Sequence, residues 1–551
     1  MAVTSEQHVP VLIVGAGPIG LALAGDLGRR GIDCLVIEQS DGVVYHPRAT
    51  AINARTMELL RRFGVAERVK RDGTPPDFPH TALYLTGFGG FEIARIERPS
   101  HGGSTPSPIS PERPQRCNQI WFDPILLDHA KSFPNIAIRY RCRFEALREA
   151  GEHVIVTARD LASDSEVTIV AQYVADCSGS HSRIRRQLGI AMSGTEAGGG
   201  AATEYHLSAF MRLPELWKHH DKGKAALTFF IDEKGNWRNL VMIDGKELYR
   251  YGLTGKEFYD NPDAVDVEAL FQDVAGPNIP HEILSVLRWS ASDVVADRYR
   301  TGHVFLVGDA AHQNHPSGGF GLNTGMGDMD NIGWKLAATL QGWGGAHLLD
   351  SYETERRPIG LRNINQAWLG YADNRDRPSH PDIRKDTPAG AAARAKMKEQ
   401  ILASQPAMVL TDGIALGYRY ESSPIICPDD SEPTADNPTR YLPTARPGAR
   451  APHAWLKPPQ NNSGQSTIDL YGGGFVLLRL GDDAPDASAI EHAFRERQMP
   501  IATVAIGDPV IAKLYEKKLV LVRPDGHVAW RGDAVHQDPL SLADRVRGAS
   551  E

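Results

Sequence analysis

The sequence is poor in cysteine. Its 551 residues include only five cysteines, which are scattered, odd in number and never spaced as C-x-x-C. Neither a disulfide framework nor a zinc cluster is therefore expected, and a reducing compartment is favoured. We expect a cytoplasmic protein.

The chain also lacks a dense block of lysine and arginine, a basic leader followed by an apolar segment, and a long uninterrupted apolar run. The formal net charge is -8, which argues against nucleic acid as a partner. The longest apolar run, near the start, is broken by glycine and proline, so no membrane association is expected. Small molecules are the expected partners.

What the chain does have is length and an ordinary globular composition, with 41% hydrophobic and 23% charged residues. A chain of this length exceeds what one hydrophobic core can organise. We expect two or three domains.

The first glycine-rich motif lies near the start, in VPVLIVGAGPIGLALAGDLGRRGIDCLVIEQ. The pattern predicts a strand over 11–14, a helix to about residue 30 and a second strand over 34–37. Between the first strand and the helix, Gly15, Gly17 and Gly20 fit G-x-G-x-x-G.

This spacing is typical of a dinucleotide-binding turn. Gly15 allows the tight turn, Gly17 lets a pyrophosphate approach the backbone, and Gly20 lets helix and strand pack closely. Glu38 ends the second strand, where an acid accepts hydrogen bonds from ribose hydroxyls. Together these features predict an adenine dinucleotide but leave NAD and FAD open.

A second glycine-rich segment, GDAAHQNHPSGGFGLNTGMGD over 308–328, joins a predicted buried strand to a predicted helix. Its glycines would let a large flat ligand rest against main chain. Asp309 is placed to accept hydrogen bonds from a polyol. The helix start near Gly321, Leu322 and Asn323 would stabilise negative charge on an electron-rich ring, which a reduced flavin needs and NAD does not.

Between the two glycine segments, HPRATAINARTMELLRRFGV predicts an amphipathic helix with Arg48 before it and Arg55 inside it. Two interpretations stay open at this point. The arginines either flank the helix as solvated charges or contact the cofactor.

The motifs GAGPIG, PRATAINARTMELL, RCNQIWFDPILL, GDAAHQNHPSGGFGLNTGMGD and SYETERRP occur in this order. Together they resemble the group A FAD-dependent aromatic monooxygenases, the superfamily of p-hydroxybenzoate hydroxylase and phenol hydroxylase. The resemblance implies an α/β fold, in which a Rossmann-type FAD-binding domain is interleaved with a β-sheet substrate domain. It spans roughly residues 10 to 365.

The same resemblance assigns cofactor contacts residue by residue. Arg48 matches an arginine near the flavin and pyrophosphate, Gln119 a glutamine that contacts the cofactor, and Asp309 the ribityl-binding aspartate. The loop beside the isoalloxazine ring is matched by Pro316 and by the backbone of Gly321, Leu322 and Asn323.

The activity implied by the resemblance is hydroxylation of a phenolic or related aromatic substrate with molecular oxygen, through a flavin C4a-hydroperoxide. NADPH or NADH would be a transient reductant, because no second strand, glycine turn and helix unit occurs. One motif departs from the family pattern: Ser178 stands where an aspartate is usual, which puts reductant docking in doubt. Asp176 nearby is a candidate substitute, and a simple helix-capping turn is the alternative.

Catalytic candidates lie in predicted sheet strands between residues 204 and 254. Tyr249, Tyr251 and His206 could line a cavity or assist deprotonation of a phenol, although ordinary sheet packing or a surface position is the favoured interpretation of each. Because residues alternate along a strand, Tyr249 and Tyr251 share a face. His312 and His315 flank the flavin loop, but no acid or cysteine pattern accompanies them, so no metal is expected.

The expected domain division follows the motifs. Residues 1–80, 112–198 and 290–365 form the FAD-binding domain, 81–111 and 199–289 the substrate domain, and 366–440 a helical connector and arm. Residues 441–551 resemble the thioredoxin-like C-terminal domain of the phenol hydroxylase branch. It contains no cysteine, so dithiol chemistry is excluded there, and a structural or homodimer-forming role is expected.

Other fates of the same flavin remain open at this stage. A halogenase is disfavoured because none of the nine tryptophans lies two positions from another, as W-x-W-x-I-P requires. An oxidase, a Baeyer-Villiger type oxygenase and a non-catalytic flavin-binding sensor stay as alternatives.

Overall fold

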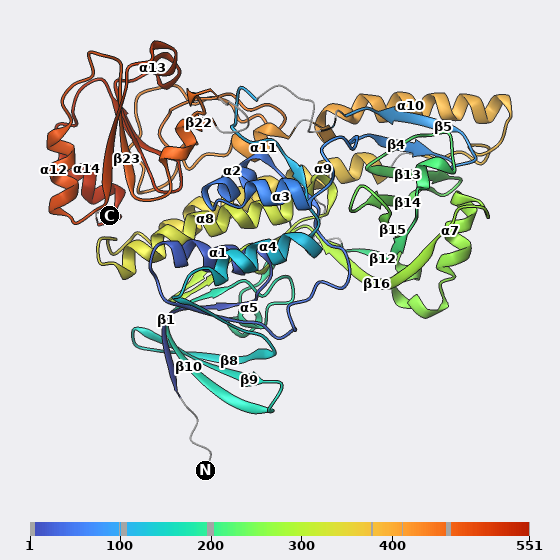
Figure 1. The fold of residues 1–551 in the computed structure, drawn as a ribbon, viewed down its shortest axis with the longest axis horizontal. Coiled ribbons are helices and arrows are strands. Elements are labelled where there is room, and N and C mark those ends of the chain that lie inside the picture. Colours follow the sequence, from blue (N-terminus) through green and yellow to red (C-terminus); the bar gives the residue numbers. More distant parts are fainter. Residues whose placement is uncertain are drawn as a thin grey trace.

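Three large β-sheets, each covered by helices, organise the described part of the chain (Figure 1), and the other sheets have only two or three strands. The computed structural model describes residues 6–98, 100, 107–194, 203–375, 378–409, 411–458 and 464–549. The expected boundary at 198/199 lies outside the described residues, and the other expected domain boundaries stay predictions.

The first sheet has the order β18-β19-β10-β1-β2-β7, with β8 and β9 extending from β10. Its centre is parallel and fully buried, as expected of strands covered on both faces. The predicted β-α-β unit is present. The strands are β1 Gln7–Val14, β2 Cys34–Ile37, β7 Ile136–Arg139, β8 Cys142–Ala150, β9 His153–Asp160, β10 Ser165–Asp176, β18 Arg300–Thr301 and β19 Val304–Leu306.

Helices α1 (Pro18–Arg29), α4 (Gln119–Lys131) and α8 (Phe320–Leu340) cover one face of this sheet. Close approach between α1 and α8 depends on glycine. A Cβ on Gly325 would lie 2.9 Å from Ile19 Cδ1, and one on Gly333 would lie 2.4 Å from Asp26 Oδ2. Both glycines are therefore required by packing, and α8 lies directly against the helix that follows the first glycine turn.

The second sheet has seven strands in the order β16-β12-β15-β14-β13-β4-β5. Helix α7 (Val267–Ala275) packs on one face and completes a core there. The opposite face is turned toward the first domain, because His46 of that domain contacts Ser285 and Phe210 of the sheet. The strands are β4 Ala82–Leu85, β5 Glu92–Ile96, β12 Thr203–Arg212, β13 Leu227–Asp232, β14 Gly235–Met242, β15 Leu248–Thr254 and β16 Glu282–Ser292.

The C-terminal domain contains a four-stranded sheet, β24-β23-β25-β26, in which only the β23–β24 pair is parallel. Helices α12 and α14 cover one face and α13 the other, as expected of an α/β domain. The elements are β23 Phe475–Leu480, α12 Ser488–Glu496, β24 Ile501–Ile506, α13 Pro509–Tyr515, β25 Leu519–Val522, β26 Val528–Gly532 and α14 Pro539–Val546.

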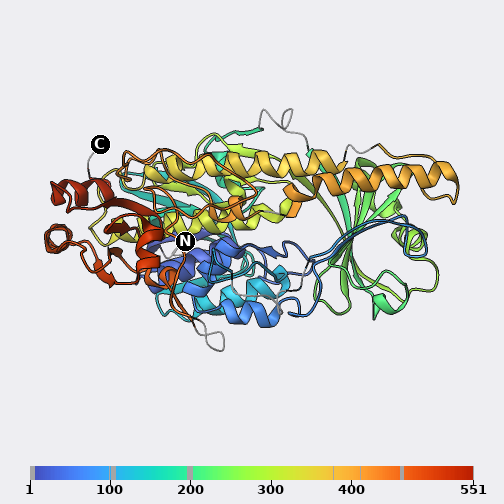
Figure 2. The same ribbon diagram turned by 90° about the horizontal axis from the view of Figure 1, so that it is seen from above.

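Long helices join these units (Figure 2). Helix α9 (Ser351–Arg375) begins beside α8, and α10 (Pro388–Val409) packs on β5 of the second sheet through Met397 and Ile401. The expected connector is thus partly a cover for that sheet. Within the described residues, no helix is long and apolar enough to cross a membrane.

The remaining elements are short. They are β3 Ala51–Ile52, α2 Ala54–Arg62, α3 Ala66–Asp72, β6 Gln115–Arg116, α5 Arg183–Gln187, β11 Met192–Gly194, α6 Lys256–Asp260, β17 Val294–Ala296, β20 His312–Gln313, α11 Asp412–Leu416, β21 Trp455–Lys457 and β22 Gln465–Ser466.

Candidate flavin and substrate site

The first glycine turn has the shape that a dinucleotide requires. Gly15 has φ 109°, and a Cβ there would lie 2.4 Å from Cys177 O. A Cβ on Gly20 would lie 1.9 Å from Gly15 O, whereas a Cβ on Gly17 would meet nothing within 4 Å. Gly15 and Gly20 are thus required by internal packing, and Gly17 leaves open space where a pyrophosphate would approach. Glu38 lies at the same turn and accepts a hydrogen bond from Ala16 N at 2.9 Å.

A buried cluster of charged side chains supports the backbone of the second glycine segment. Asp328 accepts a hydrogen bond from Gly308 N at 3.1 Å and lies 2.7 Å from both His312 Nε2 and Arg356 Nε. Burial alone would raise the pKa of Asp328, but the charges of Arg356 and His312 lower it. The cluster therefore fixes the backbone from which Asp309 projects.

Asp309 has the properties of a ligand-binding carboxylate. Its side chain is exposed, and it makes no hydrogen bond to any described residue. Yet the surrounding protein desolvates the carboxyl group and raises its pKa, while the positive charge of nearby Arg48 opposes this. A carboxyl group that is exposed to solvent and yet surrounded by enough protein to be desolvated must lie in a cleft. A Cβ on Gly321 would lie 3.9 Å from Asp309 Oδ1, so Arg48, Asp309 and Gly321 meet there.

The predicted ring-side loop leads directly into α8. Gly321, Leu322 and Asn323 lie in the first turn of that helix, as expected of a helix that starts near these residues. Pro316 is exposed in the preceding loop. The Asn323 side chain is engaged within the protein: Nδ2 donates to Ala51 O at 3.0 Å and to Gly319 O at 2.7 Å.

Gln119 supports the segment that carries Arg48. Its Oε1 accepts a hydrogen bond from Ala49 N at 3.2 Å, and its Nε2 donates to Asp123 at 3.3 Å. Burial raises the pKa of Asp123 to about 7. The structure therefore brings Gln119 and Arg48 into one neighbourhood, as expected.

The turn that carries Ser178 behaves as a helix cap. Ser182 Oγ accepts a hydrogen bond from Arg185 N at 2.9 Å at the start of α5. Asp176 is fully buried and accepts hydrogen bonds from Ser178 Oγ at 2.5 Å and from Ser182 Oγ. A carboxylate enclosed in this way is not accessible to a reductant. Asp176 therefore does not replace the missing aspartate at the surface.

Opposite the flavin segments lies the face of the second sheet that carries His206, Phe210 and Arg250. Phe210 pairs with Arg250 and His206 with Thr254 across β12 and β15. Since side chains alternate along a strand, the neighbouring Tyr249 and Tyr251 point the other way. The sheet therefore offers a polar and aromatic face to the cleft.

Tyr249 and Tyr251 lie in the core beneath α7. Tyr251 is fully buried, and its hydroxyl donates to Leu270 O at 2.9 Å. Burial raises the pKa of both phenols. This arrangement favours the packing interpretation for the two tyrosines.

His206 belongs to a cluster that joins the substrate sheet to the flavin loop. Its ring stacks on Trp289 at 4.0 Å, Nδ1 lies 3.1 Å from Thr254 Oγ1, and Nε2 lies 2.8 Å from Glu204 Oε2. His315 Nε2 lies 2.6 Å from the same oxygen.

The acid partner of His315 was therefore missed, because it is distant in sequence. Glu204, His206 and His315 have their ligand atoms within 4.8 Å of one another, a spacing that could hold a metal ion. Alternatively, the short contacts from His206 and His315 satisfy the Glu204 carboxylate without a metal ion.

Two arginines in the cleft have no acidic partner among the described residues. Arg250 donates only to Asn239 Oδ1, at 3.3 Å, and Arg116 makes no side-chain hydrogen bond. Desolvation lowers the pKa of Arg250 to about 10. Desolvation, together with the positive charges of Arg98 and Arg250, also lowers the pKa of Arg116 to about 10. Two desolvated, mutually repelling cations suit an anionic ligand. Sequence inspection missed both, since a single arginine in a strand carries no motif.

Comparison with protein families agrees with this geometry. A family model described as "FAD binding domain" matches residues 8–367, and one described as "Aromatic-ring hydroxylase, C-terminal" matches residues 444–549. Among curated relatives, the 4-methyl-5-nitrocatechol 5-monooxygenase of a Burkholderia species is 32% identical over 98% of this chain and 97% of its own. The tetracenomycin B2 monooxygenase-dioxygenase of Streptomyces olivaceus is 31% identical over 98% of each chain.

Solved structures show the same relationship over the whole chain. RebC, a rebeccamycin biosynthetic enzyme solved with bound 7-carboxy-K252c, superposes with a TM-score of 0.90 at 37% identity, covering 99% of this chain and 100% of its own. Aklavinone-11 hydroxylase, solved with FAD and aklavinone, has a TM-score of 0.81 at 28% identity over 99% and 100%.

The glycine turns, the open carboxylate of Asp309 and these matches agree on FAD as the cofactor, with NAD(P)H the reductant typical of the family. The protein belongs to the FAD-dependent aromatic-ring hydroxylases, monooxygenases that act on aromatic and polyketide substrates.

Proposed function

We propose that the protein uses NADH or NADPH to hydroxylate an acidic aromatic compound, which Arg116 and Arg250 bind through an anionic oxygen. The observation that carries this proposal is the absence of an acidic partner for either guanidinium among the described residues. Both side chains are half-buried, and desolvation of two neighbouring guanidinium groups is unfavourable unless an anion compensates their charge. Either a carboxylate or a phenolate would supply it.

Bound FAD would accept hydride from the nicotinamide and activate molecular oxygen for transfer to the ring. Overall, one oxygen atom enters the substrate as a hydroxyl group, and the other leaves as water with the electrons of NAD(P)H. The residues of this chain bind and orient the reactants. The N-terminal turn of α8 would face the electron-rich edge of the flavin ring. Arg116 and Arg250 would favour binding of a phenolate over a phenol, because their positive charges stabilise the anion.

The experiment that tests the function measures NAD(P)H oxidation with a panel of phenols, nitrocatechols and aromatic acids, followed by product mass. A substrate should accelerate NAD(P)H consumption and gain the mass of one oxygen as a hydroxyl group. A flavin-binding sensor would give neither result, and a ring-expanded ester product would show Baeyer-Villiger chemistry. Homodimer formation and cytoplasmic location stay predictions from the sequence.

The role expected of His206 as a proton acceptor is tested by pH dependence. Burial lowers the pKa of His206 below its ordinary value of 6.5, although Glu204 partly offsets this. The imidazole is then neutral at pH 7, and activity should fall only on acidification, with an apparent pKa below 6.5 in kcat/KM. His206→Gln should remove this acidic limb. Tyr251→Phe is the matched control, and an unchanged profile in His206→Gln would contradict the role.

A further inference from the structure

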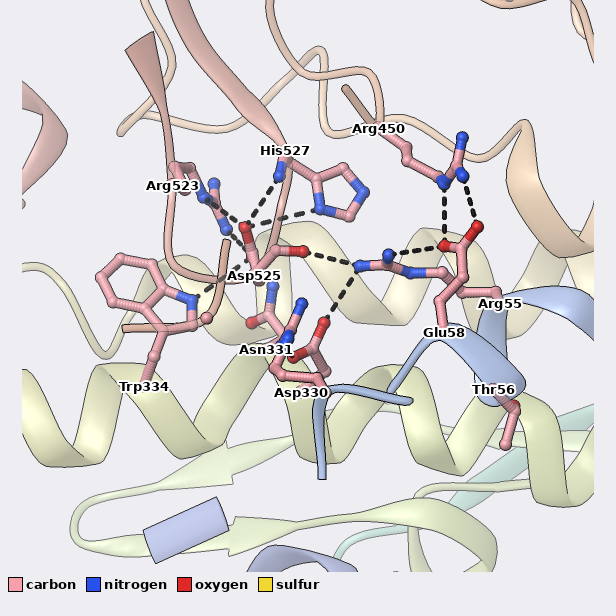
Figure 3. A network of polar contacts seen from close by, with 12 residues as sticks. Arg55, Thr56, Glu58, Asp330, Asn331, Trp334, Arg450, Arg523, Asp525 and His527 are labelled. Atoms are coloured by element: carbon pink, nitrogen blue, oxygen red, sulfur yellow. Dashed lines mark hydrogen bonds and ion pairs between the residues drawn. The ribbon is translucent and has the colours of Figure 1, made fainter. Parts of the chain in front are cut away.

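The C-terminal domain is tied to the flavin-binding domain by a buried network of charges (Figure 3). Arg55 of α2 lies at its centre: Nη1 donates to Glu58 Oε2 at 3.0 Å, and Nη2 donates to Asp330 Oδ2 at 3.1 Å. The same Nη2 donates to the backbone oxygen of Asp525, in the turn before β26, at 2.6 Å. Arg55 is only 4% exposed. It is therefore neither a solvated charge nor a cofactor contact.

The network continues on both sides of Arg55. Arg450, from the segment that enters the C-terminal domain, donates from Nε to Glu58 Oε2 at 3.0 Å. Burial alone would raise the pKa of Glu58, but the positive charges of Arg450 and Arg55 hold this pKa at about 2. Asp525 in turn pairs with Arg523 at 2.5 Å and accepts from Trp334 Nε1 of α8 at 3.3 Å. The charged side chains of Arg55, Glu58, Asp330, Arg450, Arg523 and Asp525 are thus all paired with opposite charges, so removal of one partner would leave a buried charge uncompensated.

The start of α2 also contacts the first turn of α8. Thr56 Oγ1 donates to Asn323 Oδ1 at 2.7 Å, and Asn53 N donates to the same oxygen at 2.9 Å. Asn53 also caps α2 by accepting from Thr56 N at 2.9 Å. Asn323 in turn holds Gly319, the residue before α8. Adjacent residues of one short helix thus bind the C-terminal domain through Arg55 and the ring-side turn through Thr56.

We propose that the C-terminal domain acts as a clamp on the flavin site, with Arg55 as the positioning residue and α2 as the element that transmits its effect to Asn323. The clamp fixes the first turn of α8, against which the isoalloxazine ring would rest. This gives a function to a domain that contains no cysteine and therefore no dithiol chemistry.

The test compares FAD binding among variants of the full-length protein. FAD is removed and added back, and its dissociation constant and dissociation rate are followed by flavin fluorescence. Thr56→Val, which keeps shape and removes one hydrogen bond, should weaken FAD binding about 2- to 10-fold. Arg55→Met should weaken it at least as much, mainly through faster dissociation. Arg55→Lys should recover part of the loss.

Arg61→Met is the matched control. Arg61 lies on the same helix and also reaches the C-terminal domain, through Asp469 at 2.6 Å and Gly464 O at 2.8 Å, but it lies at the rim of the interface. The FAD affinity of the Arg61→Met variant should stay within about 2-fold of wild type. The Arg55→Met/Thr56→Val double variant should lose less than the product of the single effects, because both act through Asn323.

Wild-type affinity in Thr56→Val would overturn the proposal, as would equal losses in Arg55→Met and Arg61→Met. Should Arg55→Met fail to fold, Thr56→Val and Arg55→Lys still decide the matter, because each leaves most of the buried network in place.

Discussion

Asp309→Ala should yield a folded protein that is purified without its yellow cofactor. The carboxylate is an exposed hydrogen-bond acceptor in the cleft and makes no hydrogen bond to any described residue, so its removal takes away ligand contacts and little else. A hydrogen bond to a charged group contributes about 1.5–3 kcal/mol, which corresponds to roughly 10- to 150-fold in affinity for each lost contact. The measurement is the ratio of flavin to protein absorbance, with the dissociation constant of added FAD.

Asp309→Asn serves as the matched variant for this prediction. It keeps the shape and one acceptor oxygen but not the charge, so its affinity should lie between those of wild type and Asp309→Ala. Circular dichroism should show the same fold for all three proteins. An Asp309→Ala protein that retains full flavin would show that this carboxylate does not face the cofactor.

Local patterns predicted FAD as the cofactor and the form of the first glycine turn, for a physical reason. In the first turn, Gly15 and Gly20 are required by atoms of the turn and of its neighbouring strand, so their spacing is dictated by a geometry that every such turn shares. Strand β2 was predicted to the residue because it is a short apolar run bounded by turn residues.

The substrate side could not be predicted in the same way. Arg116 lies on β6 and Arg250 on β15, in two different sheets, and only the tertiary fold brings them close enough for the charge of Arg250 to lower the pKa of Arg116. Tyr249 and Tyr251 were correctly placed on one face, yet the sequence could not say which face the cleft would occupy. The partner of Arg55 at Asp525 lies 470 residues away, so no local pattern distinguishes this buried arginine from a solvated one.

Arg250→Met should weaken binding of an acidic aromatic ligand roughly 10- to 150-fold, the range for loss of a hydrogen bond to a charged group, with no loss of FAD. Because the substrate is unidentified, the probes are benzoate and phenol, each compared with a neutral analogue, benzamide and anisole respectively. Binding is followed by perturbation of the flavin absorbance. Benzoate should lose affinity in the variant if a carboxylate is recognised, and phenol should lose affinity at alkaline pH if a phenolate is recognised. The neutral analogues should change little.

Arg288→Met, which removes an exposed arginine from the same sheet, is the control and should leave all four affinities unchanged. Unchanged affinity for both acidic probes in Arg250→Met would contradict the assignment of the anion site.

Stability gives an independent check on the same variant. Burial lowers the pKa of Arg250, which means that its positive charge costs free energy in the folded protein without a ligand. Arg250→Met replaces this charge with an apolar side chain of similar length, so the thermal midpoint should be equal to or higher than that of wild type. A protein that becomes no less stable while losing anion binding shows that the charge is kept for the substrate. A lower midpoint would instead assign Arg250 to the structure of the sheet.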